Sequence, residues 1–213
     1  MGGRGAGLGT GSGVPIDVRS QMDVWSYRHN PNNEDFVDAI NTGVLRIQDD
    51  FPDVMNTVER VNSAELGGAD SFSVLGFWDS SEKTLALNQN FTNINAMNRT
   101  YDAAVKSGYH PARGDRTGTE AVALHEMGHA LTDHVAAKMG LNDLDAAAKR
   151  IVDAAYRASP GAGNGKKWAG TISGYAQENN AECIAEAVAD YYCNGSKAAA
   201  ASKAIMEQLR RYR

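Results

Sequence analysis

The chain has 213 residues, of which 42% are hydrophobic and 22% charged, with a formal net charge of −5. This length is sufficient for one globular domain with a sizeable core. The acidic balance argues against a nucleic-acid binder, which usually carries a basic surplus. No stretch approaches the roughly 20 apolar residues that span a bilayer, so we expect no nucleic-acid and no membrane partner.

The predicted elements follow a glycine-rich start. Residues 1–13 contain seven glycines and no apolar period, which is typical of a flexible tail, and residues 14–213 are expected to form a single domain. Apolar residues at helical spacing predict a helix over about 34–48. Phe51-Pro52-Asp53 ends this helix, and a strand could then cover 54–61.

The N-terminal stretch of the sequence lacks the apolar core of a secretory signal. Nothing in the sequence directs export, and the localisation stays open.

The middle of the chain alternates strand and helix signals. Two β-rich runs at 71–78 and 83–88, separated by a short polar segment, predict a hairpin. A helix is predicted over 93–107, closed by Gly108. Thr117-Gly118-Thr119-Glu120 fits a capping box, so the next helix should begin there and run to about Met139.

The C-terminal part is expected to be helical. A helix is predicted over 144–158, followed by a glycine-rich connection at 160–165. The last two predicted helices cover 180–193 and 196–213. Cys183 and Cys193 would lie on one of them, about 15 Å apart along its axis, which is beyond disulfide reach. The basic end Arg210-Arg211-Tyr212-Arg213 is expected to complement the dipole of the last helix.

One predicted helix carries a spacing typical of a zinc site. His125 and His129 are four residues apart, so a helix places both imidazoles on one face. Two neutral imidazoles can bind zinc, and a catalytic site keeps one position open for water. Glu126 projects about 100° away from His125 and would flank the metal as a base. A third ligand must distinguish such a site from a helix with two ordinary histidines.

Two nearby residues are poor candidates for the third ligand. His134 lies five residues after His129, which rotates it about 140° off the metal face, so we expect a packing or surface role. Asp133 shares the face of His129 but lies one turn too far to complete a tetrahedron. A role behind the ligands or at the surface is expected for it.

Glu182 is the third candidate. Glu182, Glu186 and Asp190 recur every four residues on a predicted helix that is otherwise apolar nearly all round. A solvated face would need a broader polar surround, so a metal ligand at Glu182, backed by a hydrogen-bonding Glu186, explains the pattern better. Asn179 with Glu182 also fits a capping-box spacing, which would occupy the same carboxylate.

Together these motifs resemble the gluzincin metallopeptidases, whose prototype is thermolysin. The likeness is carried by His125-Glu126-Met127-Gly128-His129 and by Glu182-Cys183-Ile184-Ala185-Glu186. Tyr175 stands seven residues before Glu182, an arrangement similar to that of the lethal-factor-type peptidases. The resemblance extends over roughly residues 70–193.

The resemblance implies a zinc-dependent endopeptidase acting on a peptide or protein substrate. It implies that His125, His129 and Glu182 bind Zn²⁺, that Glu126 is the base, and that Tyr175 faces the developing oxyanion. Glu186 would orient a ligand histidine from behind.

The expected fold is α+β and zincin-like. It has a small mixed sheet with an edge hairpin over the active-site helix, and a helical C-terminal half. A peptide could add to such an edge strand, although an ordinary sheet hairpin fits the residues equally well.

Two other hypotheses remain open on sequence alone. A metal-stabilised structural or interaction module, of the phage or mobile-element type suggested by the glycine-rich start, would bind metal without cleaving peptides. Glu126 argues against it, because a site kept for stability has no use for a base there. An acidic helical protein with chance histidines would bind no stoichiometric metal.

Overall fold

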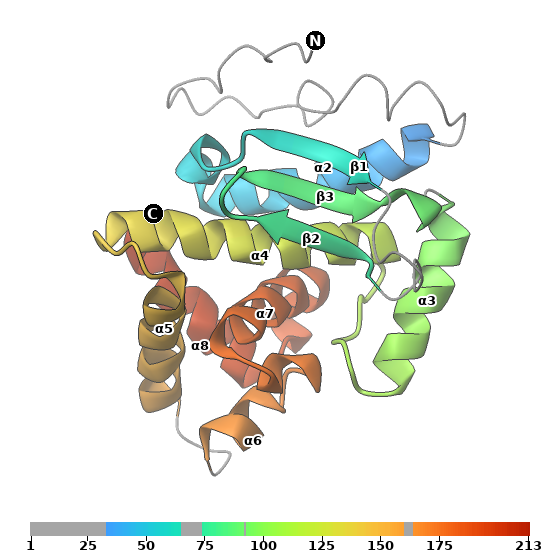
Figure 1. Cartoon of the computed structure of the whole chain (residues 1–213). Helices are drawn as coiled ribbons and strands as arrows, with labels where there is room; N and C mark the ends of the chain where they lie inside the picture. The colour runs from blue at the N-terminus through green and yellow to red at the C-terminus, as the bar shows by residue number, and fades with distance from the viewer. Residues whose placement is uncertain (1–32, 65–73, 92, 160–163) are drawn as a thin grey trace.

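The computed structural model describes residues 33–64, 74–91, 93–159 and 164–213, which form an α+β structure with a small three-stranded sheet (Figure 1). The predicted tail at 1–13 and the first three residues of the predicted hairpin, 71–73, lie outside the described residues. Among the residues described, no helix is both long and apolar enough to cross a membrane.

The sheet is mixed, with strand order β1-β3-β2. The strands are β1 (Arg60–Ala64), β2 (Gly76–Asp79) and β3 (Thr84–Asn88). β3 is the central strand, buried along its whole length, and pairs parallel to β1 and antiparallel to β2. The hairpin prediction is therefore confirmed for its described residues, and β2 lies at one edge of the described sheet.

The strand predicted over 54–61 is wrong for most of its length. Residues Pro52–Asn56 form a 3₁₀ helix, η2, and the strand begins only at Arg60. Pro52 occupies the start of η2, where its fixed φ suits a helical turn. Val54, Met55 and Val58 are buried together, a spacing of one helical turn and not the alternation of a strand.

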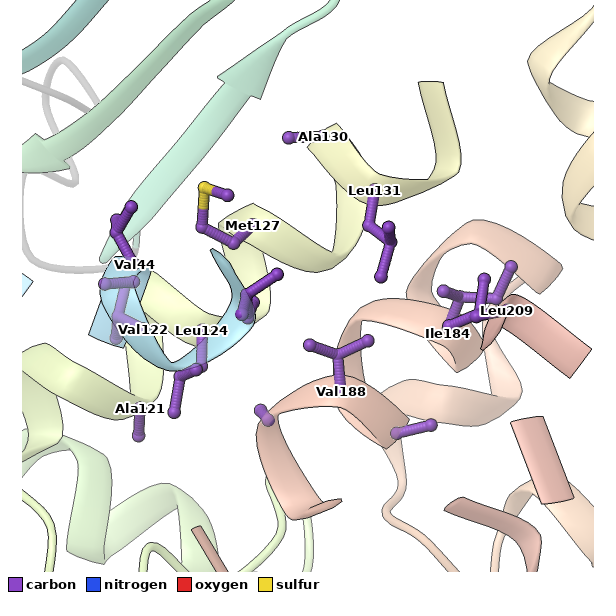
Figure 2. Close-up of a cluster of buried hydrophobic side chains, with 14 of the residues drawn as sticks. Val44, Ala121, Val122, Leu124, Met127, Ala130, Leu131, Ile184, Val188 and Leu209 are labelled. Carbon is purple, nitrogen blue, oxygen red and sulfur yellow. The ribbon is translucent and has the colours of Figure 1, made fainter. Parts of the chain in front are cut away.

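Helix α4 (Gly118–Lys138) runs through the centre of the molecule. The predicted capping box is present: the Thr117 side chain accepts from the Glu120 backbone, and the Glu120 side chain accepts from the backbone of Thr117. Nearly every residue from Gly118 to Ala136 is buried, because other elements surround the helix. Figure 2 shows its side chains directed towards Val44 on one side and Ile184 and Val188 on the other.

Among the described residues, three helices make the largest helix contacts with α4. These are α2 (Asn33–Asp50), α3 (Ile94–Lys106) and α7 (Asn180–Asn194). The predictions for these helices hold to within a few residues, because each has local signals such as Asn93, which caps α3 through two backbone N–H groups. α7 makes the most extensive contact with α4.

The C-terminal half is helical, as predicted, with α5 (Leu144–Ala158) and α8 (Ala200–Leu209) around α7. The last predicted helix is shorter than 196–213, because 3₁₀ turns lie on both sides of α8. A short helix, α6 (Gly165–Ala169), begins within the predicted connection. Both cysteines are free thiols, as expected.

The basic C-terminal end forms ion pairs with Asp50, which is far away in the sequence. The guanidinium of Arg210 lies 2.7 Å from the carboxylate of Asp50 at the end of α2 and 2.9 Å from the hydroxyl of Tyr191. Arg213 also lies within ion-pair range of Asp50. This end therefore joins α2 to the last helices, in addition to any interaction with a helix dipole.

Candidate metal centre

Helices α4 and α7 bring the three predicted ligands together. His125, His129 and Glu182 offer ligand atoms that all lie within 4.8 Å of one another. Glu182 Oε2 is 3.2 Å from His125 Nε2 and 3.4 Å from His129 Nε2. The two histidines come from successive turns of α4, and Glu182 comes from the first turn of α7.

The donor set fits a zinc ion. Glu182 Oε2 is buried and has no hydrogen-bond partner among the described residues, so the two imidazoles approach it without hydrogen-bonding geometry. A buried carboxylate oxygen that makes no hydrogen bond is unfavourable, and a cation would satisfy it. Two atoms bound about 2.1 Å from a tetrahedral zinc lie roughly 3.4 Å apart. The observed separations of 3.2 and 3.4 Å match that spacing.

The charges at the centre are strongly coupled. Burial alone would raise the pKa of the Glu182 carboxyl, but contacts with His125 and His129 outweigh burial and hold the pKa well below its usual range. Burial would lower the pKa of His125, yet the carboxylates of Glu182 and Glu186 raise it well above 6.5. A metal ion would therefore compete with a proton for His125, and metal binding should release protons.

Glu186 holds His125 from the side opposite to the ligand cluster. Its Oε1 atom lies 2.8 Å from His125 Nδ1, and its Oε2 atom accepts a hydrogen bond of 2.7 Å from Ser173. Burial of Glu186 is complete and would raise its pKa, but His110 and His125 lower the pKa to about 2. An ionised carboxylate only accepts, so the His125 proton in this bond belongs to Nδ1, and Nε2 is directed at Glu182.

The capping alternative for Glu182 occurs only in part. The Asn179 side chain accepts a hydrogen bond of 2.9 Å from the backbone N–H of Glu182, and so caps α7. The reverse bond of a capping box is not formed, in contrast to the Thr117 cap. The Glu182 carboxylate faces the histidines instead.

Glu126 and Tyr175 lie beside the ligands. Glu126 is buried, and burial raises the pKa of its carboxyl although His125 and His129 oppose the shift. The Tyr175 ring stacks on His125, with centroids 5.7 Å apart and planes 11° apart. Burial, together with the nearby Glu182 charge, raises the pKa of the Tyr175 phenol, so this phenol keeps its proton at neutral pH.

A cavity that is partly open to solvent reaches the centre at His125 and Glu126. One wall is formed by Val74, Leu75 and Gly76, the last of which is the first residue of β2. The other wall consists of the aromatic side chains of Tyr109, His110 and Tyr175. Gly76 is required at the first wall, because a Cβ there would lie 2.9 Å from Val122 and 3.0 Å from the Glu126 carboxylate.

His134 and Asp133, which were weighed as third ligands, and Asp190, which shares the carboxylate stripe of α7, are not part of the ligand cluster. His134 is buried, and its Nε2 has no hydrogen-bond partner among the described residues. Asp133 accepts from Trp78 Nε1 at 3.1 Å and from Lys83 Nζ at 2.7 Å, and so ties the β2–β3 hairpin to α4. Asp190 accepts from Ser202 and from the backbone at the start of α8. Asp133 and Asp190 thus join neighbouring elements.

Sequence reasoning missed two residues that contact Glu186. His110 lies in the loop after α3, with Nδ1 3.0 Å from Glu186 Oε1. Ser173 lies in the loop before Tyr175. Neither residue belongs to a periodic pattern with the ligands, so only the three-dimensional arrangement reveals their contact.

Comparisons of the chain with protein-family models, with curated proteins and with solved structures each found no match.

Proposed function

We propose that this protein is a zinc-dependent endopeptidase with a zincin-like active site. The observation that carries the proposal is the buried Oε2 of Glu182, which makes no hydrogen bond and faces the Nε2 atoms of His125 and His129. These three residues would hold the metal. When bound, zinc supplies a Lewis acid that activates water and polarises a carbonyl oxygen.

Glu126 would act as the general base. It follows the ligand His125 directly and lines the cavity, so its carboxylate lies beside the proposed metal position. The pKa of its carboxyl is raised towards neutral pH, which suits a group that accepts a proton and later returns it. Glu126 would take a proton from the attacking water and pass it to the leaving amine.

Tyr175 would donate a hydrogen bond to the oxygen of the scissile carbonyl as negative charge develops there. Its ring packs against His125, which places the phenol next to the ligand cluster. One well-placed donor of this kind contributes about 3 kcal/mol to a transition state.

Strand β2 would bind the substrate backbone. The backbone N–H of Asn88 donates to the carbonyl of Leu75 at 2.9 Å. Backbone groups of an antiparallel strand alternate in direction, so Gly76 and Trp78 direct theirs away from β3. Gly76 lines the cavity together with Glu126, so an extended peptide could add there as a further strand.

The test is cleavage of a diverse peptide mixture by zinc-loaded protein, read by mass spectrometry. Glu126→Gln should retain the metal and lose at least about a hundredfold in turnover, because it lacks the base. Glu207→Gln is the matched control, since Glu207 is exposed on α8, and it should cleave like the wild type. Equal cleavage by Glu126→Gln would contradict the assigned base. Folded, zinc-loaded wild type that cleaves nothing would instead favour the metal-stabilised module.

A further inference from the structure

We propose that His110 is a positioning residue for the metal centre, acting through Glu186 on the ligand His125. The inference rests on the proposed metal site, but not on peptide cleavage. His110 belongs to neither sequence motif and lies in the loop between α3 and α4.

One carboxylate oxygen of Glu186 is shared by His125 and His110. Glu186 Oε1 lies 2.8 Å from His125 Nδ1 and 3.0 Å from His110 Nδ1, while Ser173 donates to Oε2. Both Nδ1 atoms lie within hydrogen-bond distance of this oxygen, and a carboxylate oxygen can accept from two donors. Three donors thus fix the carboxylate that orients His125. Loss of one of them would leave Glu186 freer to move and His125 less firmly directed.

Aromatic neighbours hold the His110 ring in place. Its ring stacks on the buried Tyr101, with centroids 5.2 Å apart and planes 6° apart. Tyr109 and Tyr175 contact it edge-on. Its side chain is only 13% exposed, so the imidazole can deliver its hydrogen bond from one defined position.

The loop that carries His110 is also hydrogen-bonded to the segment that carries Tyr175. The backbone N–H groups of Gly174 and Tyr175 donate to the carbonyls of Gly108 and Tyr109, at 2.7 and 3.0 Å. The rings of Tyr109 and Tyr175 stack with centroids 4.9 Å apart. Gly108 ends α3 with φ of +76°, a conformation that favours glycine. The segment 108–110 therefore supports both His125, through Glu186, and the proposed oxyanion donor.

A pair of variants separates hydrogen bonding from packing. His110→Phe keeps an aromatic ring for Tyr101 but removes the donor. His110→Asn removes the ring but can place an amide N–H near the position of Nδ1. If His110 positions Glu186, the Phe variant should be the weaker metal binder, whereas a packing role predicts the reverse order.

The measurement is Zn²⁺ affinity by competition with a chromophoric chelator, together with the Co²⁺ absorption spectrum and the Tm of the metal-free protein. His110→Phe should weaken zinc binding by about 3- to 10-fold, less than the 10–100-fold typical when a direct partner of a ligand is lost. It should also alter the Co²⁺ spectrum, and His110→Asn should restore most of the affinity. Ser173→Ala, which removes a donor from the other oxygen of Glu186, should change affinity in the same direction.

Wild-type affinity and spectrum in His110→Phe would overturn the inference, as would a lower affinity in His110→Asn than in His110→Phe. Wild type that binds no stoichiometric zinc would overturn the proposed metal centre, and this inference with it. Wild type that binds zinc but cleaves no peptide would refute the peptidase proposal alone, because the His110 comparison depends only on metal binding.

Discussion

At His125, the two ring nitrogens have different partners, and this difference defines the chemistry of the site. Nδ1 is held by the buried carboxylate of Glu186, while Nε2 faces Glu182 Oε2. The two glutamates of α7 therefore differ. The carboxylate of Glu186 accepts hydrogen bonds, whereas the Oε2 atom of Glu182 makes no hydrogen bond. Such a pairing of ligand and supporting carboxylate is common at histidine-bound metals.

Tyr175 allows a test at the level of one hydroxyl group. Tyr175→Phe keeps the ring that stacks on His125, so we expect zinc binding to persist. Loss of the oxyanion donor should reduce kcat by about a hundredfold with a smaller change in KM. The measurement is steady-state hydrolysis of a peptide identified by mass spectrometry. Tyr212→Phe, near the C-terminus, is the control, and an unchanged kcat in Tyr175→Phe would exclude the assigned role.

At the level of elements, the centre depends on how closely α4 and α7 approach. Gly128, between the two proposed ligand histidines, makes this approach possible, because a Cβ there would lie 2.6 Å from the Cα of Ala185. The close contact brings the first turn of α7, with Glu182, alongside the histidine face of α4. The glycine inside the histidine motif is therefore explained by packing between helices.

This packing predicts an unusual result for a helical glycine. Gly→Ala inside a helix ordinarily stabilises it by up to about 1 kcal/mol, but Gly128→Ala should destabilise the protein by about 1–3 kcal/mol because α7 must move. Zinc affinity should fall as Glu182 moves with α7. The measurement is chemical denaturation with parallel zinc titration. Gly165→Ala, in α6 with nothing within 4 Å of its Cβ position, should be neutral or stabilising. A Gly128→Ala protein as stable as the wild type would refute this explanation.

At the scale of the whole molecule, the sequence predicted the elements that carry local signals. The Thr117-Glu120 capping box placed the start of α4, and helical spacing within α4 and α7 placed the ligands on their faces. Local patterns failed between Pro52 and Val58, where apolar residues pack as a turn. They also missed α6, whose cap, Asn164, lies in a run of glycines.

Contacts that join distant parts of the chain were beyond sequence reasoning. His110 and Ser173 meet at Glu186 from two separate loops, and Arg210 meets Asp50 across 160 residues. Each partner is an ordinary polar residue in its own segment, and only the packed helices bring the partners together. The proposed ligand set was easier to predict from sequence, because two of its members lie on successive turns of one helix.

The central claim, that His125, His129 and Glu182 bind one zinc ion, is tested most directly by the metal content of the purified protein. Wild type loaded with zinc and freed of excess should hold one ion per chain. Glu182→Ala should lose it, whereas Glu178→Ala, which removes an exposed carboxylate four residues earlier, should retain it. Full zinc occupancy in a folded Glu182→Ala protein would contradict the assignment of the third ligand and the account built on it.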